Sequence, residues 1–332
     1  MSSLFMSQRA ALCTLLASFA LACVFTACAA ETRLKPETTP MMTYPIGRFE
    51  IDVPPTFTLA IQTQKLRYAE ITETPWPKDV AREQARKQLW EARLTEIEKL
   101  SPPKNKKTVV IEIKDFPQWP HFAKGVLYYG DRLVGSTVFW DFLLDGGSFA
   151  IWLKIDGTSR DMMLQIISDI ARAYHPGDPL SRGLKGDWFY TRYGALNLPY
   201  LEQEETYARF EKHPLELKVS VETKETHTDE APNEGLLART AAVIASGYAA
   251  GVDIEKIRSR QKSIGDFMGE EEVLRFKTAE KVNLEFGWRY AGKKDSGTQP
   301  HIRIRMDSPD GQFDEKLKIW DDLLSSFKPV AQ

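Results

Sequence analysis

Cysteine is nearly absent from this 332-residue chain, and its three copies, Cys13, Cys23 and Cys28, all lie close to the N-terminus. The chain beyond residue 28 therefore has no thiol for a disulfide, a nucleophile or a thiolate metal site. An excess of one charge is also lacking, because 44 Lys and Arg stand against 46 Asp and Glu. That balance argues against a nucleic-acid partner.

The usual catalytic signatures are missing as well. The sequence contains no Gly-x-Ser-x-Gly, His-Glu-x-x-His, Walker or Gly-x-Gly-x-x-Gly motif, and its five histidines are scattered. Asp115 and Asp266, which each precede a Phe, are the remaining candidates for a carboxylate pair. The simpler interpretation is that each Asp caps a turn at a strand end. We therefore predict no catalytic residue, no cofactor and no metal site.

The first 28 residues have the layout of a secretory signal peptide. Arg9 is the only charged side chain before Glu31, and residues 10–24 are an apolar run too short for a membrane span. Phe25-Thr26-Ala27-Cys28 resembles a lipobox, which makes Cys28 the predicted lipidation site. Simple cleavage after Ala29 or Ala30 is the alternative. Residues 29–43 are rich in Thr, Pro and Lys and read as a tether, so we expect an exported protein in the periplasm, anchored to a membrane.

The second half of the sequence repeats patterns of the first half in the same order. Five pairs of segments carry the repeat: 47–54 and 194–199, 113–116 and 264–267, 126–129 and 273–276, 138–144 and 284–290, and 151–155 and 302–306. Five echoes in one order favour an internal duplication over chance.

Hydrophobic periodicity predicts an α+β fold of two similar domains, each an antiparallel-rich sheet packed with two helices. We expect domains at 44–175 and 184–329, separated by a Pro- and Gly-rich linker at 176–183. Helices are expected near 79–100, 159–174, 233–251 and 314–327. In the third helix, Asn233 is the expected N-cap, and Leu237, Ala241, Ile244 and Tyr248 are expected to line one face.

Several C-terminal motifs carry a family resemblance. They are Met268-Gly269-Glu270-Glu271-Glu272-Val273-Leu274-Arg275, the segment 284–293 with its aromatic-x-Trp-x-aromatic pattern, and Pro300-His301-Ile302 before the last strand. With the opening segment 47–54, they resemble the immunity proteins that accompany type VI secretion phospholipase effectors. More narrowly, the sequence is similar to the class-four Tle-cognate immunity family.

This resemblance implies a non-enzyme in the periplasm that binds a lipase or phospholipase effector and inhibits it by clamping it between two domains. We expect the partner-binding residues in loops and at acidic or aromatic positions. The candidates are Glu270, Glu271 and Glu272 in a predicted acidic turn, the aromatics Trp76 and Trp119, and Asp229 and Glu230 in a polar loop. The alternatives are an envelope- or lipid-binding lipoprotein without a toxin partner, and a hydrolase that uses a carboxylate pair.

The lipidation of Cys28 can be tested by metabolic labelling with a palmitate analogue. The wild-type protein should take up the label and Cys28→Ala should not, because only the lipobox cysteine is acylated. Cys23→Ala is the matched control and should stay labelled. An unlabelled wild-type protein would favour simple cleavage after Ala29 or Ala30 instead.

Overall fold

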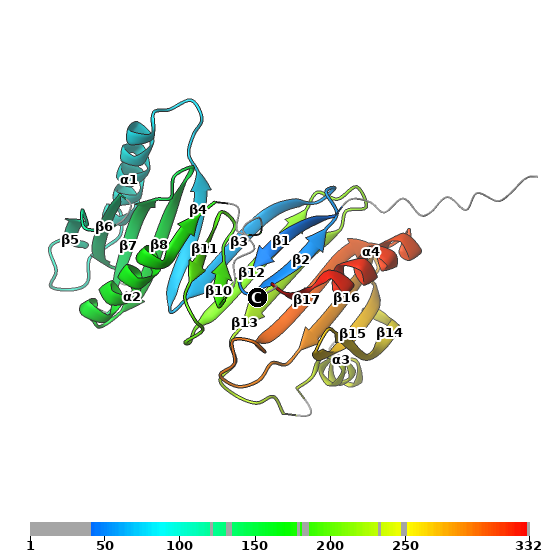
Figure 1. Cartoon of the computed structure of the whole chain (residues 1–332). Helices are drawn as coiled ribbons and strands as arrows, with labels where there is room; N and C mark the ends of the chain where they lie inside the picture. The colour runs from blue at the N-terminus through cyan, green and yellow to red at the C-terminus, as the bar shows by residue number, and fades with distance from the viewer. Residues whose placement is uncertain are drawn as a thin grey trace, which may run out of the picture. The chain divides into compact units, whose positions relative to one another are not determined.

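Twelve strands form one antiparallel sheet that runs through both halves of the chain (Figure 1). In order across the sheet they are β14 (Asp253–Ile264), β15 (Phe267–Lys277), β16 (Val282–Tyr290), β17 (His301–Pro309), β13 (Lys218–Lys224), β12 (Glu204–Glu211), β3 (Thr58–Leu66), β4 (Ala69–Pro75), β8 (Phe149–Gly157), β7 (Val138–Asp145), β6 (Ala123–Tyr129) and β5 (Val110–Asp115). The pairing of β12 with β3 joins the two halves. Outward from that junction, the strands of each half follow in the same order.

The computed structural model describes residues 41–119, 122–130, 135–177, 180, 186–231, 234–246 and 251–330. The predicted signal peptide, Cys28 and Asn233 lie outside these residues. None of the described helices is long and apolar enough to cross a membrane.

Two helices pack on opposite faces of the sheet in the N-terminal half. Helix α1 (Arg82–Glu98) buries Trp90 and Ile97 against strand residues that include Val126, whereas α2 (Arg160–Ala173) packs on residues that include Leu127. Successive strand residues point to opposite faces, so neighbouring residues of β6 face different helices. The sequence starts α2 where Ser159 accepts a hydrogen bond from the backbone nitrogen of Met162 at 3.4 Å.

The C-terminal half has the same arrangement of helices. Helix α4 (Phe313–Ser326) buries Trp320, Leu323 and Leu324 on one face of the sheet. Helix α3 (Leu236–Ala245) lies on the other face, against β14 and β15. The expected α+β class with four helices is therefore confirmed. No residue of α3 is buried, so the face expected from Leu237, Ala241 and Ile244 does not pack into a core, and Tyr248 lies outside the described residues.

Two β-hairpins are exchanged between the halves. The N-terminal hairpin of β1 (Met42–Ile46) and β2 (Phe49–Val53) belongs to the hydrophobic core of the C-terminal half, where Phe49 stacks on Phe327 with ring centroids 5.3 Å apart. The second hairpin, β10 (Trp188–Tyr190) and β11 (Gly194–Asn197), contributes Phe189 and Leu196 to the core of the N-terminal half. Packing therefore crosses the boundary expected at 176–183.

The strand that follows the last helix of each half completes the exchange. After α2, β9 (Tyr174–Pro176) pairs with β11, and after α4, β18 (Lys328–Pro329) pairs with β2. Each hairpin thus becomes a three-stranded sheet with a strand from the half that it covers.

The two exchanged hairpins meet at Gly47. Its carbonyl accepts a hydrogen bond from the backbone nitrogen of Tyr190 at 2.8 Å. Gly47 has φ +65°, and a Cβ there would lie 2.7 Å from Oγ1 of Thr206, so the close approach requires glycine. From the sheet below, the amides of Gln62 and Gln64 donate to the carbonyls of Pro45 and Tyr190.

The N-terminal hairpin should be essential for stability although it lies far from its core in sequence. Ile51→Ala should lower the free energy of unfolding by about 2–5 kcal/mol, because it removes fully buried methyl groups from the C-terminal core. Met42→Ala in the neighbouring strand is the control and should change it by less than about 0.5 kcal/mol, since Met42 is exposed. Denaturant unfolding measures both, and equal effects would refute the exchanged packing.

Candidate functional site

One face of the central strands is left uncovered. Residues opposite each other on antiparallel strands point to the same face. The register therefore places two rows on one face: Glu272, Gly287, Arg305, Ser220, Arg209 and Ile61, and then Lys65, Glu70, Lys154, Asp141 and Val126. Ile61 and Lys65 lie four residues apart on β3, so the two rows share a face. We call the middle of it, Arg305, Ser220, Arg209, Ile61, Lys65, Glu70 and Lys154, the open face.

The open face lies between two helices on the same side of the sheet. At one end, the guanidinium of Arg93 on α1 pairs with Asp141 at 2.6 Å. At the other end, Glu272 accepts a hydrogen bond from Thr240 of α3. Both exchanged hairpins cover the opposite side, so nothing among the described residues covers the middle. Ile61 is accordingly 44% exposed in the interior of a central strand.

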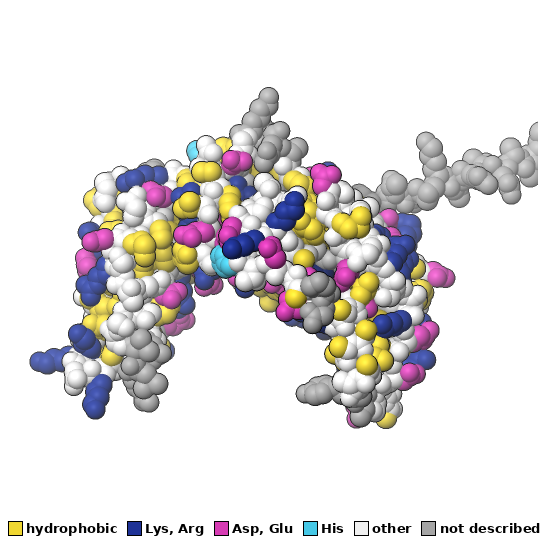
Figure 2. Space-filling model, turned by 90° about the horizontal axis from the view of Figure 1, so that it is seen from below, with side chains coloured by type: hydrophobic (Ala, Val, Ile, Leu, Met, Phe, Trp, Pro, Cys, Tyr) yellow, Lys and Arg dark blue, Asp and Glu magenta, His cyan; other side chains and the backbone are white. Residues whose placement is uncertain are grey.

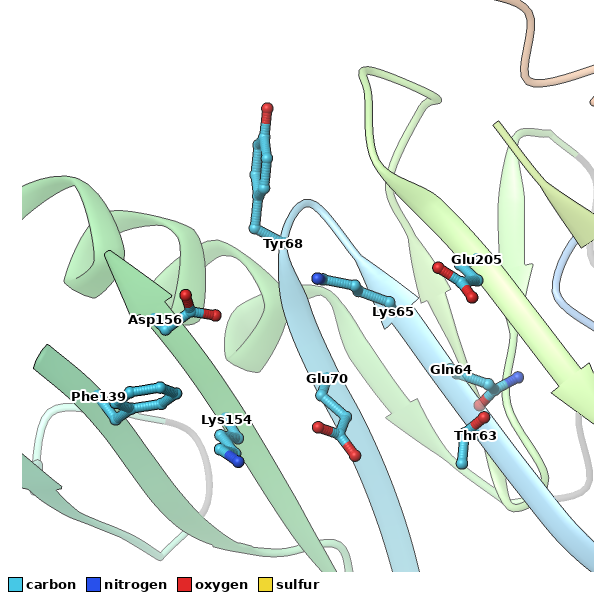
Figure 3. Close-up of a pocket in the computed structure, with 9 residues that line it drawn as sticks. All are labelled: Thr63, Gln64, Lys65, Tyr68, Glu70, Phe139, Lys154, Asp156 and Glu205. Atoms are coloured by element: carbon cyan, nitrogen blue, oxygen red, sulfur yellow. The ribbon is translucent and has the colours of Figure 1, made fainter. Parts of the chain in front are cut away.

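A depression of about 280 Å³ marks the centre of the open face (Figure 3). Its lining includes Lys65, Glu70, Lys154, Asp156 and Glu205, from β3, β4, β8 and β12, while Tyr68 points away from the sheet. Lys65, Glu70 and Asp156 form no ion pair with another described residue. A shallow depression lined by charges of both signs is typical of a surface that contacts a polar protein partner.

The surface view agrees with this mixed character. In Figure 2, acidic and basic side chains alternate with hydrophobic ones, and neither sign gathers into a continuous belt on the face shown. The side shown therefore has no belt of one charge, and specificity there would rest on individual contacts.

The three adjacent acids lie in β15, so the predicted acidic turn is wrong. Because strand side chains alternate, Glu270 and Glu272 point to α3 and Glu271 points to α4. Glu270 accepts a hydrogen bond from the backbone nitrogen of Leu237 at 3.0 Å. It caps the first turn of α3, whose own N-cap, Gly235, has no side chain to do so. Glu272 and Thr240 join the same helix to the sheet.

Glu271 is fully buried and holds α4 in place. It accepts hydrogen bonds from Arg260 at 2.6 Å, from Arg258 at 3.0 Å and from the indole nitrogen of Trp320 at 2.9 Å. Burial opposes ionisation of this carboxyl, but these hydrogen bonds and nearby Lys262 outweigh it and hold its pKa below the ordinary value. Glu271 therefore has no free oxygen to offer a partner.

The aromatic candidates are more buried than expected. Trp119 is a core residue that stacks on Phe116 and Phe142, with centroids 4.6 Å and 5.5 Å away, so its expected place in an exposed loop is wrong. Trp76 is partly buried against the cluster beneath α1. Both rings fill the interior of the N-terminal half.

Asp229 and Glu230 lie in the loop between β13 and α3. Asp229 is exposed, whereas Glu230 is partly buried and pairs with Arg239 of α3 and Arg289 of β16. Of the seven candidates, Asp229 is the one freely available to a partner, and its contact with one remains a prediction.

Sequence reasoning missed the exposed apolar surface of α3. Val243 and Ile244 are 45% and 40% exposed, and residues 241–246 are all classed as exposed. The signal was in the sequence, since Leu236–Ala245 has one charged residue. The hydrophobic periodicity of α3 is that of a core helix. The strands beneath it, β14 and β15, carry polar side chains on that side, so the helix does not lie in a core. Exposed apolar helices of this kind are docking surfaces.

The carboxylate pair considered for a hydrolase does not form. Asp115 ends β5 and Asp266 lies in the turn between β14 and β15, so the two residues sit at opposite edges of the twelve-stranded sheet. Both side chains are exposed. These positions fit the simpler interpretation as residues at strand ends.

Comparison with known proteins agrees with these features. Residues 193–330 match the family model described as the Tle cognate immunity protein 4 C-terminal domain. Among curated proteins, none matches the sequence. The fold is similar to that of the apo immunity protein TplEi of the T6SS from Pseudomonas aeruginosa, with a TM-score of 0.69 and 16% identity over 89% of this chain and 98% of that one.

Two further structures share the fold. A chain in the crystal structure of the Tle4-Tli4 complex has a TM-score of 0.69 at 17% identity, with 87% of this chain and 97% of that chain covered. TplEi complexed with "L" peptide has a TM-score of 0.66 at 17% identity, with 89% and 99% covered. The fold is thus one that type VI immunity proteins adopt. The match of residues 193–330 to the Tle cognate immunity protein 4 model confirms the resemblance seen in the sequence.

Removing the charge of Glu271 should destabilise the protein in a pH-dependent way. Glu271→Gln should cost about 3 kcal/mol of unfolding free energy at pH 7, because it breaks a buried ion cluster. The folded pKa lies below the unfolded one, so this contribution is complete above the ordinary Glu pKa of about 4.3 and is lost as pH falls through the lower folded value.

Denaturant unfolding between pH 3 and pH 8 measures the difference. The exposed Glu280→Gln is the matched control and should stay within about 0.5 kcal/mol of wild type throughout. A deficit in Glu271→Gln that does not shrink at low pH would show that the carboxylate is not ionised in the fold.

Proposed function

We propose that this protein is a periplasmic immunity protein that binds and inhibits a type VI secretion phospholipase effector of the Tle class. The family match of residues 193–330 carries the proposal. A solved Tle4-Tli4 complex with the same fold supports a direct protein contact. The protein is further proposed to be a lipoprotein that is held at the membrane through Cys28 and the 29–43 tether, which would place it where such an effector acts.

The proposed contact surface is the open face together with the two helices that flank it. The sheet offers Ile61 and, further along the same face, the unpaired charges of Lys65, Glu70 and Asp156, while α3 offers Val243 and Ile244. Helices α1 and α3 lie on the same side of the sheet, towards its two opposite edges. An effector segment that crosses the open face from one edge to the other therefore reaches both helices. This arrangement supports the expected clamping by two domains, with no catalytic role for the protein.

We also propose that the two halves descend from one duplicated unit. The support is the common strand order on either side of the β3–β12 junction, with α1 matching α3 and α2 matching α4. The segments that echo each other in the sequence fall on corresponding strands, such as β7 and β16. The duplicated part is scaffold, and the apolar surface of α3 is specific to the second copy.

Binding can be tested with a purified phospholipase effector of the Tle class. The two proteins should co-purify, and lipase activity should fall to background as the protein is titrated to a slight molar excess. Full lipase activity in the presence of excess protein, with no complex at micromolar concentration, would refute the proposal. Binding to lipid vesicles without any effect on the lipase would favour the envelope-binding alternative.

Two variants test the proposed surface. Ile61→Asp on the open face and Val243→Asp on α3 should each weaken the complex at least about tenfold, because each places a charge in a desolvated contact. Met162→Asp is the matched control, since Met162 is 59% exposed on α2, on the covered side of the sheet. Calorimetric titration gives the affinities, and thermal unfolding checks the fold. Wild-type affinity in both test variants would place the interface elsewhere.

A further inference from the structure

Two loops bring together a histidine and two carboxylates outside the open face. Glu225 and His227 follow β13, and Asp295 lies in the loop between β16 and β17. The Nδ1 atom of His227 is 3.2 Å from Oδ1 of Asp295 and 3.9 Å from Oε1 of Glu225. One donor atom from each of the three residues lies within 4.8 Å of the others.

The cluster has more negative charge than its surroundings balance. The side chain of Glu225 is 5% exposed, yet within the described part of the chain His227 is its only ion-pair partner. Asp295 likewise pairs with His227 alone. A neutral imidazole supplies no charge, and a buried carboxylate without a permanent cation is costly. The remaining partners of Glu225 are neutral donors, the hydroxyl of Tyr200 and the backbone nitrogen of Gln203.

We propose that Glu225, His227 and Asp295 bind a divalent transition-metal ion, with Zn²⁺ as the best fit. One imidazole nitrogen and two carboxylate oxygens are a normal set of three protein ligands, with water completing the tetrahedron. Ligand atoms about 2.0–2.1 Å from Zn²⁺ are separated by about 3.4 Å in a tetrahedron. Two of the observed separations, 3.2 Å and 3.9 Å, lie near this value and the third is within 4.8 Å, so side-chain rotations bring the atoms onto an ion.

A fourth residue supplies the expected support for the histidine. The amide of Gln203 lies 2.9 Å from Nε2 of His227, the ring nitrogen that faces away from the carboxylates. Metal-bound histidines donate their second ring N–H to such an acceptor, which fixes the tautomer. The amide oxygen of Gln203 accepts that proton after a rotation of the amide group, whose oxygen and nitrogen are interchangeable in shape.

The ion would join loops that are far apart in sequence. The backbone nitrogen of Asp295 already donates to the carbonyl of Thr226 at 2.8 Å, so the two loops are aligned before any ion binds. The loop that carries His227 continues to Asp229 and Glu230 and then to α3. A bound ion would therefore fix the approach to α3.

Titration of untagged, chelator-treated full-length protein with ZnCl₂ at pH 7 tests the site by calorimetry. The wild type should bind one Zn²⁺ per chain, and its Tm should rise by about 5 °C at a hundredfold excess over Kd. His227→Gln and Asp295→Asn should each bind more than about tenfold more weakly. Both side chains are more than half exposed, so these variants should fold.

Asp229→Asn is the matched control, because it removes an exposed carboxylate from the same loop, and it should bind Zn²⁺ as the wild type does. The absence of binding up to millimolar Zn²⁺ would overturn the proposal. Undiminished binding by His227→Gln would also overturn it, since that result indicates adsorption to surface carboxylates. Equal affinity for Ca²⁺ that survives His227→Gln would assign the cluster to an oxygen-only site instead.

Discussion

The exchange of hairpins is the constraint on which the rest of the structure depends. Each half of the twelve-stranded sheet has an apolar face that its own hairpin does not cover, and the hairpin of the other half covers it. The core of the C-terminal half, between α4 and the sheet, contains Phe49, Ile51 and Val53. The core of the N-terminal half contains Phe189 and Leu196. Because large apolar side chains dominate folding energetics, neither core is complete without residues from the other half. The halves are therefore energetically one unit, although their strand orders are alike.

The same exchange decides where a partner can bind. Both hairpins and the helices α2 and α4 lie on one side of the sheet, so among the described elements the other side keeps α1 and α3, one at each end. The central strands between them carry charged side chains and Ile61 on that side, and buried apolar ones on the other. The open face is thus a direct consequence of placing both hairpins on the other side of the central strands. The scaffold is built from corresponding elements in both halves, whereas the apolar surface of α3 and the loops before it distinguish the C-terminal half.

The contacts of Glu270, Glu271 and Glu272 could not be predicted from the local sequence. Three adjacent acids predict repulsion and a solvated turn, but the strand alternation of β15 sends them to different helices. Two of them hold α3, and the third forms a buried cluster with Arg258, Arg260 and Trp320. Those partners lie 13, 11 and 49 residues from Glu271, so local pattern does not reveal them. The burial of Trp119 could not be predicted for the same reason, because its partner Phe142 lies on β7.

The sequence by itself determined the α+β class, the approximate positions of four helices, the repeated order of strand patterns and the resemblance to an immunity family. Each of these depends on local periodicity or on short motifs, which involve residues close to one another in the sequence. The tertiary structure alone decided which hairpin covers which half, which side of each central strand is exposed and whether an apolar helix is buried. It also brought His227 to Asp295, 68 residues away. These outcomes depend on contacts between distant segments, and the free energy that selects them comes from burying surfaces that no local window contains.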